Sequence, residues 1–181
     1  QGRPVAVIKH FERAVPLRHA LFERSLGFTT IAKIKRKYAS FLALPRHLQR
    51  TDDAVTPTTH LDLIERIKDG YLPCLFFTFS RRKCEANALE LGDNYSFLDA
   101  KQAREVQAVI EEVSQRYPAL ESERWPALRR LLLKGIAYHH AGMLPVLKDI
   151  VEELFTRRLI QVLYCTETFA VGLNFPCRTV C

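Results

Sequence analysis

The sequence predicts an α/β fold in which a mostly parallel sheet is flanked by helices. Apolar runs without the alternation of a half-exposed strand occur at Leu72–Phe79 and Ile160–Cys165, as expected for strands buried on both faces. From Gly135 onwards, strand-like and helix-like segments alternate, which favours parallel strands joined by helices. A length of 181 residues, 48% of them hydrophobic, is sufficient for a domain with its own core.

The composition is that of a protein without a membrane span, a signal peptide or disulfides. No apolar run approaches the roughly 18 residues of a membrane span, and the opening QGRPV lacks a signal-peptide pattern. We therefore expect an intracellular protein without a membrane partner, and a chain cut from something longer at both ends. The five cysteines contain no CxxC pair, which predicts reduced core thiols and neither a zinc site nor disulfides. They are Cys74, Cys84, Cys165, Cys177 and Cys181.

The first third of the chain has the weakest pattern. Pro4–Ile8 and Leu17–Phe22 are typical of an opening strand and its return. Residues from Thr29 to Asp53 show no clear period, so we expect a connecting loop or an insertion. Its basic cluster favours a solvated face over a binding site, and consists of Lys33, Lys35, Arg36, Lys37 and Tyr38.

The middle of the chain alternates more clearly. His60–Lys68 has the apolar spacing of a helix, and the strand Leu72–Phe79 follows it. After FSRRK, the segment CEANALEL is typical of a helix. Ala100–Tyr117 is predicted to be a long amphipathic helix ended by Pro118, and a further helix is expected within Glu121–Lys134.

Two further strand-to-helix units close the sequence. GIAY at 135–138 predicts a strand, and HHAG then leads into a helix that begins near Leu144, with Pro145 in its first turn. Ile160–Cys165 predicts the next strand, followed by the polar triplet TET and a short helix. The final RTVC is strand-like.

Three strand-to-helix turns, FSRRK, YHHAG and CTET, are expected at one edge of the sheet. Hydroxyl, imidazole and guanidinium groups at three strand ends make an anion-binding edge plausible, although each turn alone fits an ordinary helix start. The formal charge of +7 also favours a polyanionic partner. Adjacent histidines point to opposite faces of a strand, so they do not predict a metal site.

A complete catalytic site is not evident. The sequence contains no GxxxxGK[ST] phosphate loop, and no Asp-Glu pair at a strand end offers to hold magnesium or activate water. Gly172 and Asn174 are able to lend one face to a nucleotide that another domain holds.

Three motifs carry a family resemblance: LFFTFSRRKCE at 75–85, GIAYHHAGMLPVLKDIVEELF at 135–155 and VLYCTETFAVGLNFP at 162–176. In this order they resemble the second RecA-like lobe of superfamily-two DExH-box helicases, and within it the superkiller-type RNA helicases. The resemblance covers roughly residues 70–181. It implies a RecA-like three-layer sandwich and a parent that moves 3′ to 5′ along nucleic acid by hydrolysing ATP between two lobes.

The resemblance also implies roles for individual residues. Ser80 and Arg82 would lie near backbone phosphates, as would the HHxG segment of His139, His140 and Gly142. The start of the third motif is similar to one that grips a phosphate through its threonine, and supplies Thr166 and Glu167. Its end would face ATP and supplies Gly172 and Asn174. The stretch from 160 to 176 would thus couple the two ligands.

The match to the family is incomplete. The QxxGRxGR arginine motif, the phosphate loop and the DExH box are not in this sequence, so we expect this piece alone to be inactive. ATP and Mg would be shared with a first RecA-like lobe, the second expected partner beside single-stranded RNA. Residues 1–28 would form the opening strand and inter-lobe linker, and residues 29–181 the helicase C-terminal domain. A DNA-translocating helicase and a non-catalytic protein-interaction module remain the alternatives.

Overall fold

The computed structural model describes residues 16–45, 56–120, 124–170 and 176–181. The chain separates into two compact units, Gln1–Thr59 and His60–Cys181, which are described one at a time. The expected strand at Pro4–Ile8 lies outside the described residues. No helix in the described ranges is both long and apolar enough to span a membrane.

The first unit contains a β-hairpin. Strand β1 (Leu21–Glu23) pairs antiparallel with β2 (Gly27–Thr29). The turn between them needs Gly27, whose φ of 66° lies in the left-handed region. Only the end of the expected strand Leu17–Phe22 is therefore extended in a sheet, and its partner follows it in the sequence.

Two short helices follow the hairpin, and the expected loop there is wrong. Helix α1 spans Ile31–Lys37 and α2 spans Ala39–Leu42. Thr30 caps α1 by accepting a hydrogen bond from the Lys33 amide at 3.4 Å. Ile31, Ile34 and Tyr38 are spaced three and four residues apart, which is a helical period hidden by the partial alternation of IAKIKRK.

The second unit is built on a four-stranded parallel sheet in the order β4-β5-β3-β6. Its strands are β3 (Cys74–Phe77), β4 (Ile136–His139), β5 (Val162–Cys165) and β6 (Thr179–Val180). Its helices are α3 (His60–Ile67), α4 (Arg81–Asn94), α5 (Ala100–Arg116), α6 (Arg124–Leu132) and α7 (Pro145–Thr156), with 3₁₀ turns η1 (Pro118–Leu120) and η2 (Glu167–Ala170).

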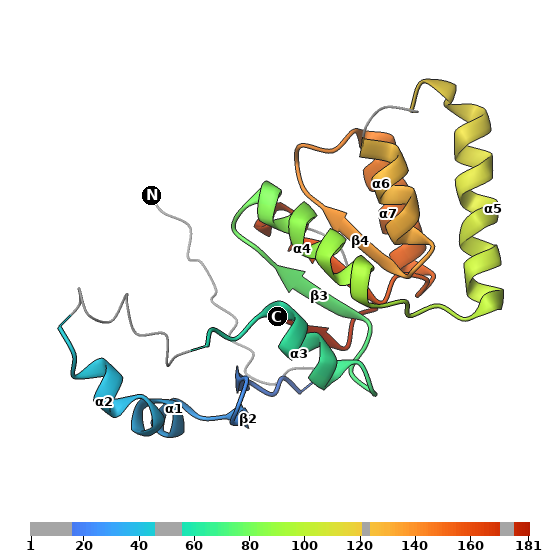
Figure 1. The fold of residues 1–181 in the computed structure, drawn as a ribbon. Coiled ribbons are helices and arrows are strands. Elements are labelled where there is room, and N and C mark those ends of the chain that lie inside the picture. The colour runs from blue at the N-terminus through green and yellow to red at the C-terminus, as the bar shows by residue number, and fades with distance from the viewer. Residues whose placement is uncertain (1–15, 46–55, 121–123, 171–175) are drawn as a thin grey trace, which may run out of the picture. The chain divides into compact units, whose positions relative to one another are not determined.

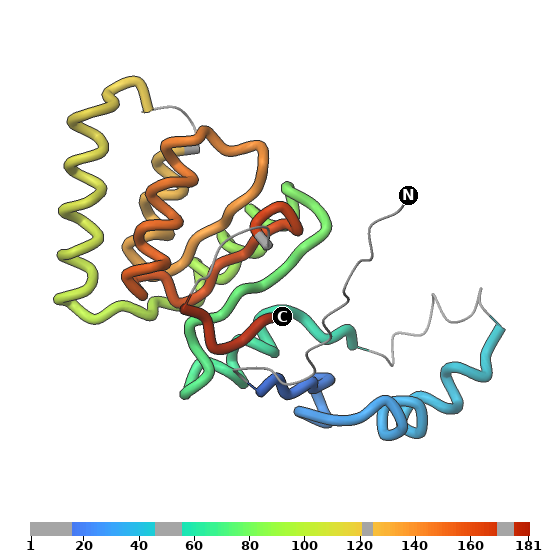
Figure 2. The backbone as a smooth tube through the Cα atoms, turned by 180° about the vertical axis from the view of Figure 1, so that it is seen from behind, coloured from blue at the N-terminus to red at the C-terminus, as the bar shows by residue number. Residues whose placement is uncertain are grey.

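Helices cover both faces of this sheet. The crossover from β3 to β4 carries α4 and α6, and the return from β4 to β5 carries α7. Because right-handed crossovers in opposite directions place their helices on opposite faces, α4 and α7 sandwich the sheet. The long helix α5 stands beside α6 and α7 in both views (Figures 1 and 2). The predicted α/β class, with the three layers of a RecA-like sandwich, is confirmed.

The core lies on the two faces of the sheet. Every residue of β4 and β5 is buried, as expected for strands covered on both sides. The largest side chains in this core come from a helix on each side and from β5: Trp125, Phe155 and Tyr164. The predicted helices at residues 100–117 and 121–134 are present as α5 and α6, and the predicted strand at RTVC is present as β6.

Candidate nucleic-acid interface

The C-terminal ends of three strands lie level with one another. Phe77 of β3 and His139 of β4 are both register partners of Cys165 at the end of β5. One residue further along, the Thr78 amide donates to the Cys165 carbonyl at 2.8 Å and the Thr166 amide to the His139 carbonyl at 3.2 Å. The three predicted strand-to-helix turns therefore share one edge of the sheet, which we call the strand-end edge.

Ser80 and Arg82 stand where β3 leads into α4. Ser80 is the N-cap of α4, and its hydroxyl accepts from the Lys83 amide at 3.4 Å. Both Ser80 and Arg82 are exposed. The Arg82 guanidinium has no hydrogen-bond or ion-pair partner among the described residues. A helix N-terminus with an unpaired guanidinium beside it is an environment that suits a phosphate group.

Phe79 was not among the predicted site residues. Its side chain is fully exposed, at 105% of the reference area, because β3 ends at Phe77 and not at Phe79 as expected. The sequence signal is the serine that follows it, since an N-cap at Ser80 leaves Phe79 outside both strand and helix. An exposed ring next to exposed cations is the combination on which single-stranded nucleic acid stacks.

His139 ties the strand-end edge to α7. Its Nε2 lies 2.8 Å from a Glu152 carboxylate oxygen, and its ring packs edge-on against Phe169 with centroids 4.5 Å apart. Burial lowers the pKa of His139, and the hydrogen bond that its Nε2 donates to Glu152 opposes this only in part. The neutral imidazole is therefore favoured, with Nε2 donating to Glu152.

His140 makes the corresponding contact on the other face. Its Nε2 lies 2.9 Å from a Glu85 carboxylate oxygen of α4, and its Nδ1 accepts from the Gly142 amide at 3.1 Å. These partners assign the proton to Nε2. A β-carbon at Gly142 would lie 3.2 Å from the His140 Nδ1, so a larger residue there would push the His140 ring by a few tenths of an ångström.

The two histidines thus point to opposite faces, as expected for neighbours at a strand end. Both are buried, at 7% and 1% exposure, and each binds a glutamate that sequence reasoning did not single out. No sequence spacing marks Glu85 and Glu152 as partners, because only the packing of α4 and α7 brings them to the edge. In the described ranges, no group of three His, Cys, Asp or Glu side chains is placed to hold a metal ion.

Thr166 and Glu167 follow β5 on the same edge. The Thr166 hydroxyl lies 3.0 Å from the Thr168 hydroxyl, and its carbonyl accepts from the Phe169 amide at 3.0 Å. Thr166 is partly exposed and Glu167 is exposed. A 3₁₀ turn, η2, begins inside the TET triplet, at Glu167, and extends to Ala170. The short helix was expected after the triplet, where residues 171–175 lie outside the described residues. Gly172 and Asn174, the predicted ATP-facing residues, lie outside the described residues.

The chain is similar to several known proteins. No family model matches the chain. Superkiller complex protein 2 of Homo sapiens is 32% identical over 206 residues, covering 98% of this chain and 16% of that protein. The exosome RNA helicase MTR4 of Homo sapiens is 32% identical over 200 residues, covering 98% and 19%. The chloroplastic DExH-box ATP-dependent RNA helicase DExH15 of Arabidopsis thaliana is 42% identical over 108 residues, covering 60% and 9%.

The chain spans a fifth or less of the length of these curated relatives. Two of these three relatives are named as RNA helicases, and the matches that cover 98% of the chain extend over nearly all of it. The chain therefore belongs to the superkiller and MTR4 type of DExH-box RNA helicases of superfamily two, and matches a segment of those longer proteins.

Proposed function

We propose that this chain is the second RecA-like lobe of an ATP-dependent 3′-to-5′ RNA helicase and that its strand-end edge grips the RNA backbone. The observation that supports the proposal is the alignment of three strand ends, because the turns that carry Ser80, Arg82 and Thr166 follow these strands at the same edge of the sheet. In parallel α/β sheets, this is the edge at which ligands bind. The names of the relatives favour RNA over DNA as the strand.

In this proposal, the exposed groups hold the phosphates and the buried groups hold the edge in shape. Arg82 supplies a bidentate cation, Ser80 and Thr166 supply hydroxyl groups, and Glu167 faces the strand beside them. His139, His140 and Gly142 lie one layer behind. Their effect on RNA binding would be indirect, because they hold the turn in the position that the exposed groups need.

ATP and Mg²⁺ would be shared with a first RecA-like lobe. The described residues do not by themselves provide a phosphate cradle or a set of magnesium ligands, so we derive no step of hydrolysis from them. Gly172 and Asn174 are proposed to face ATP, and the stretch from Thr166 to Asn174 would then connect RNA with nucleotide. Catalysis is assigned to the parent helicase.

A fluorescence-anisotropy titration with labelled single-stranded RNA tests the proposed grip. Thr166→Ala is expected to weaken binding about two- to tenfold, the effect of losing one hydrogen bond of roughly 0.5–1.5 kcal/mol. Arg82→Ala should weaken it about ten- to a hundredfold, because hydrogen bonds of a charged group contribute roughly 1.5–3 kcal/mol. Loss of a cation near a helix N-terminus does not destabilise α4, so unfolding does not explain such a result for Arg82→Ala.

Two variants serve as controls. Thr166→Ser keeps the hydroxyl group and should bind like the original chain. Arg129→Ala removes an exposed arginine from α6 and should change affinity little. The proposal fails if Arg82→Ala and Thr166→Ala bind RNA as tightly as these controls. A matched DNA strand that binds equally well would leave the backbone grip intact and remove the preference for RNA.

A further inference from the structure

The net positive charge of this protein comes from one part of the chain. Residues 1–59 contain eleven lysines and arginines but four aspartates and glutamates, an excess of seven. Residues 60–181 contain sixteen of each and are formally neutral. The whole net charge of +7 therefore belongs to the first unit, whereas the proposed strand-end grip belongs to the second.

Within the first unit, the charge is concentrated around α1. No aspartate or glutamate occurs between Glu23 and Asp52, and α1 itself carries four cations in seven residues. A mixed surface would intersperse both signs to limit repulsion. This stretch instead keeps like charges close together, and of the four cations of α1 Lys37 alone is paired to an acid of the described ranges, Glu23.

Three of the four cations of α1 lie on its exposed surface. At about 100° per residue, Ile34 and Tyr38 share one side of the helix, and both are partly buried. Arg36 falls on the opposite side, and Lys33 and Lys35 fall on the two flanks, about 160° apart. All three side chains are exposed. Among the described residues, none of these three side chains has a hydrogen-bond or ion-pair partner. We call Lys33, Lys35 and Arg36 the α1 basic face.

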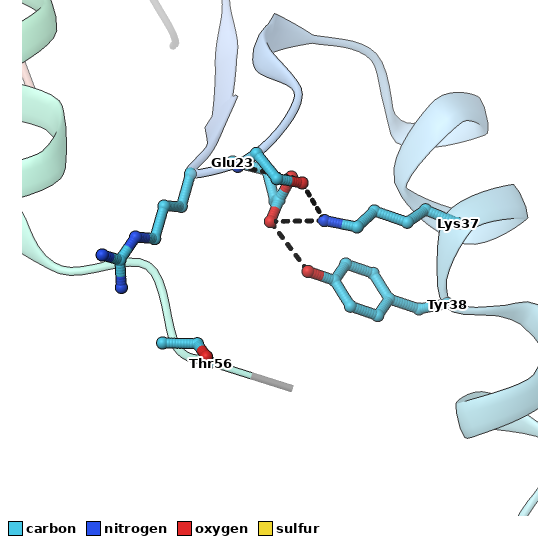
Figure 3. A pocket seen from close by; sticks show the side chains of 6 residues that line it. Glu23, Lys37, Tyr38 and Thr56 are labelled. Carbon is cyan, nitrogen blue, oxygen red and sulfur yellow. Dashed lines mark hydrogen bonds and ion pairs between the residues drawn. The ribbon is translucent and has the colours of Figure 1, made fainter. Parts of the chain in front are cut away.

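The fourth cation, Lys37, is used inside the unit. Its Nζ lies 3.0 Å from a Glu23 carboxylate oxygen, which also accepts from the Tyr38 hydroxyl at 2.8 Å (Figure 3). A cavity of about 530 Å³ beside them is lined by Glu23, Arg24, Ser25, Lys37, Tyr38 and Thr56. Because the Glu23 carboxylate forms part of its wall, this cavity does not suit a phosphate group. The anion-binding capacity lies on the outward side.

Helix stability does not explain the α1 basic face. Cations in the last turn of a helix are favoured by its dipole, by roughly 0.3–1 kcal/mol each, which accounts for Lys35 and Arg36. Lys33 lies in the first turn, where the same dipole disfavours a cation, and that turn contains no acid. A polyanion that contacts all three side chains accounts for the complete pattern.

We propose that the α1 basic face is a second contact for the RNA phosphate backbone, separate from the strand-end edge. The identity of the polyanion as RNA rests on the function proposed above. The contact is electrostatic and independent of base sequence, because lysine and arginine on an open helical face meet phosphates and not base edges. This contact raises the affinity of the chain for RNA and makes RNA binding more dependent on salt.

The test measures RNA affinity against salt for the whole 181-residue chain. The variant Lys33→Gln/Lys35→Gln/Arg36→Gln is expected to reduce the slope of log K against log salt by about 2, since each contact with a single strand contributes about 0.7. At 0.1 M salt, binding should weaken roughly ten- to a hundredfold. Lys37 is left in place because it holds Glu23, and circular dichroism checks that the fold is unchanged.

Two matched variants separate a local contact from a general loss of charge. Lys101→Gln/Arg129→Gln/Arg130→Gln removes the same charge from exposed positions in the second unit and should keep the original slope. Lys33→Arg/Lys35→Arg/Arg36→Lys keeps the charge on α1 and should also keep it. The proposal is overturned if the two glutamine triples reduce the slope equally, or if the α1 triple leaves it unchanged, as it would if this face bound an acidic protein.

These outcomes are distinct from those of the strand-end variants. If Arg82→Ala and Thr166→Ala weaken binding and the α1 triple does not, the strand-end grip stands and the second contact fails. If only the α1 triple weakens binding, the second contact stands and the strand-end assignment fails.

Discussion

Glu23 shows how one carboxylate organises the first unit. One of its oxygens accepts hydrogen bonds from the amides of Ser25 and Leu26, at 3.1 and 2.8 Å, and the other accepts from Lys37 and Tyr38. The same side chain therefore closes the hairpin turn and attaches α1 to it. Burial opposes the ionised form, but the hydrogen bonds from Tyr38, Lys37 and Ser25 outweigh it and lower the pKa of Glu23 to about 2.

We therefore expect Glu23 to titrate near pH 2 and not at its ordinary value of 4.5. Because the pKa of Glu23 is lower in the folded state than in the unfolded chain, the ionised carboxylate stabilises the fold. This stabilisation is complete above about pH 4.5 and is lost as the pH falls towards 2. Carboxyl-carbon NMR gives the titration midpoint directly. Tyr38→Phe removes one donor and should move the midpoint upward, and an original midpoint near 4.5 would contradict the hydrogen-bonding arrangement.

At the same scale, the two histidines mark the limit of sequence reasoning. Alternation along a strand was enough to predict that His139 and His140 face opposite ways. It was not enough to predict their burial or their partners, because Glu85 lies 55 residues from His140. Contacts of that separation depend on the order of strands in the sheet and on the helices that cross it.

Among the elements, α5 has the strongest local start signal. The Asp99 carboxylate accepts from the amides of Lys101 and Gln102, both at 2.8 Å, and the Gln102 side chain accepts in return from the Asp99 amide at 3.1 Å. This is a complete capping box. It defines the beginning of a helix of 17 residues, of which two, Val106 and Ile110, are fully buried.

Asp99→Ala should therefore lower the free energy of unfolding by about 1 kcal/mol, within a range of roughly 0.5–2. Urea unfolding should show a lower midpoint with an unchanged slope, because the surface exposed on unfolding stays the same. Asp99→Ser keeps an N-cap acceptor and should recover most of the loss. If the alanine and serine variants are equally destabilised, the cap is not the source of the effect.

Elements with a continuous signal were predictable, and elements with a short or mixed one were not. The buried runs that became β3 and β5, and the long amphipathic period of α5, were identified to within two residues at most ends. Helix α1 was missed because Ile31 and Ile34 alone set its period in seven residues. The end of β3 was placed two residues late because Phe79 continues an apolar run although its side chain is exposed.

At the scale of the whole molecule, core and charge are unevenly distributed. All thirty buried hydrophobic residues found in the described ranges belong to the second unit, from Ile64 to Phe169. The first unit carries the net charge and, among its described residues, has Glu23 as its buried polar side chain. The order β4-β5-β3-β6 that builds this core is not visible in the sequence, because alternation predicts parallel strands but not which ones are neighbours.

We expect residues 60–181 to fold without the first unit, because the buried hydrophobic residues that form the core lie within them. This segment should unfold in one cooperative transition. Its Tm should lie within about 4 °C of the transition of the full chain, a shift that corresponds to roughly 1 kcal/mol for a domain of this size. Calorimetry of both chains measures this.

Leu163→Ala in the buried strand β5 provides the contrast, since creating a cavity there should cost about 2–5 kcal/mol in either chain. A non-cooperative transition in the shorter chain would show that the second unit needs residues 1–59 to complete its fold.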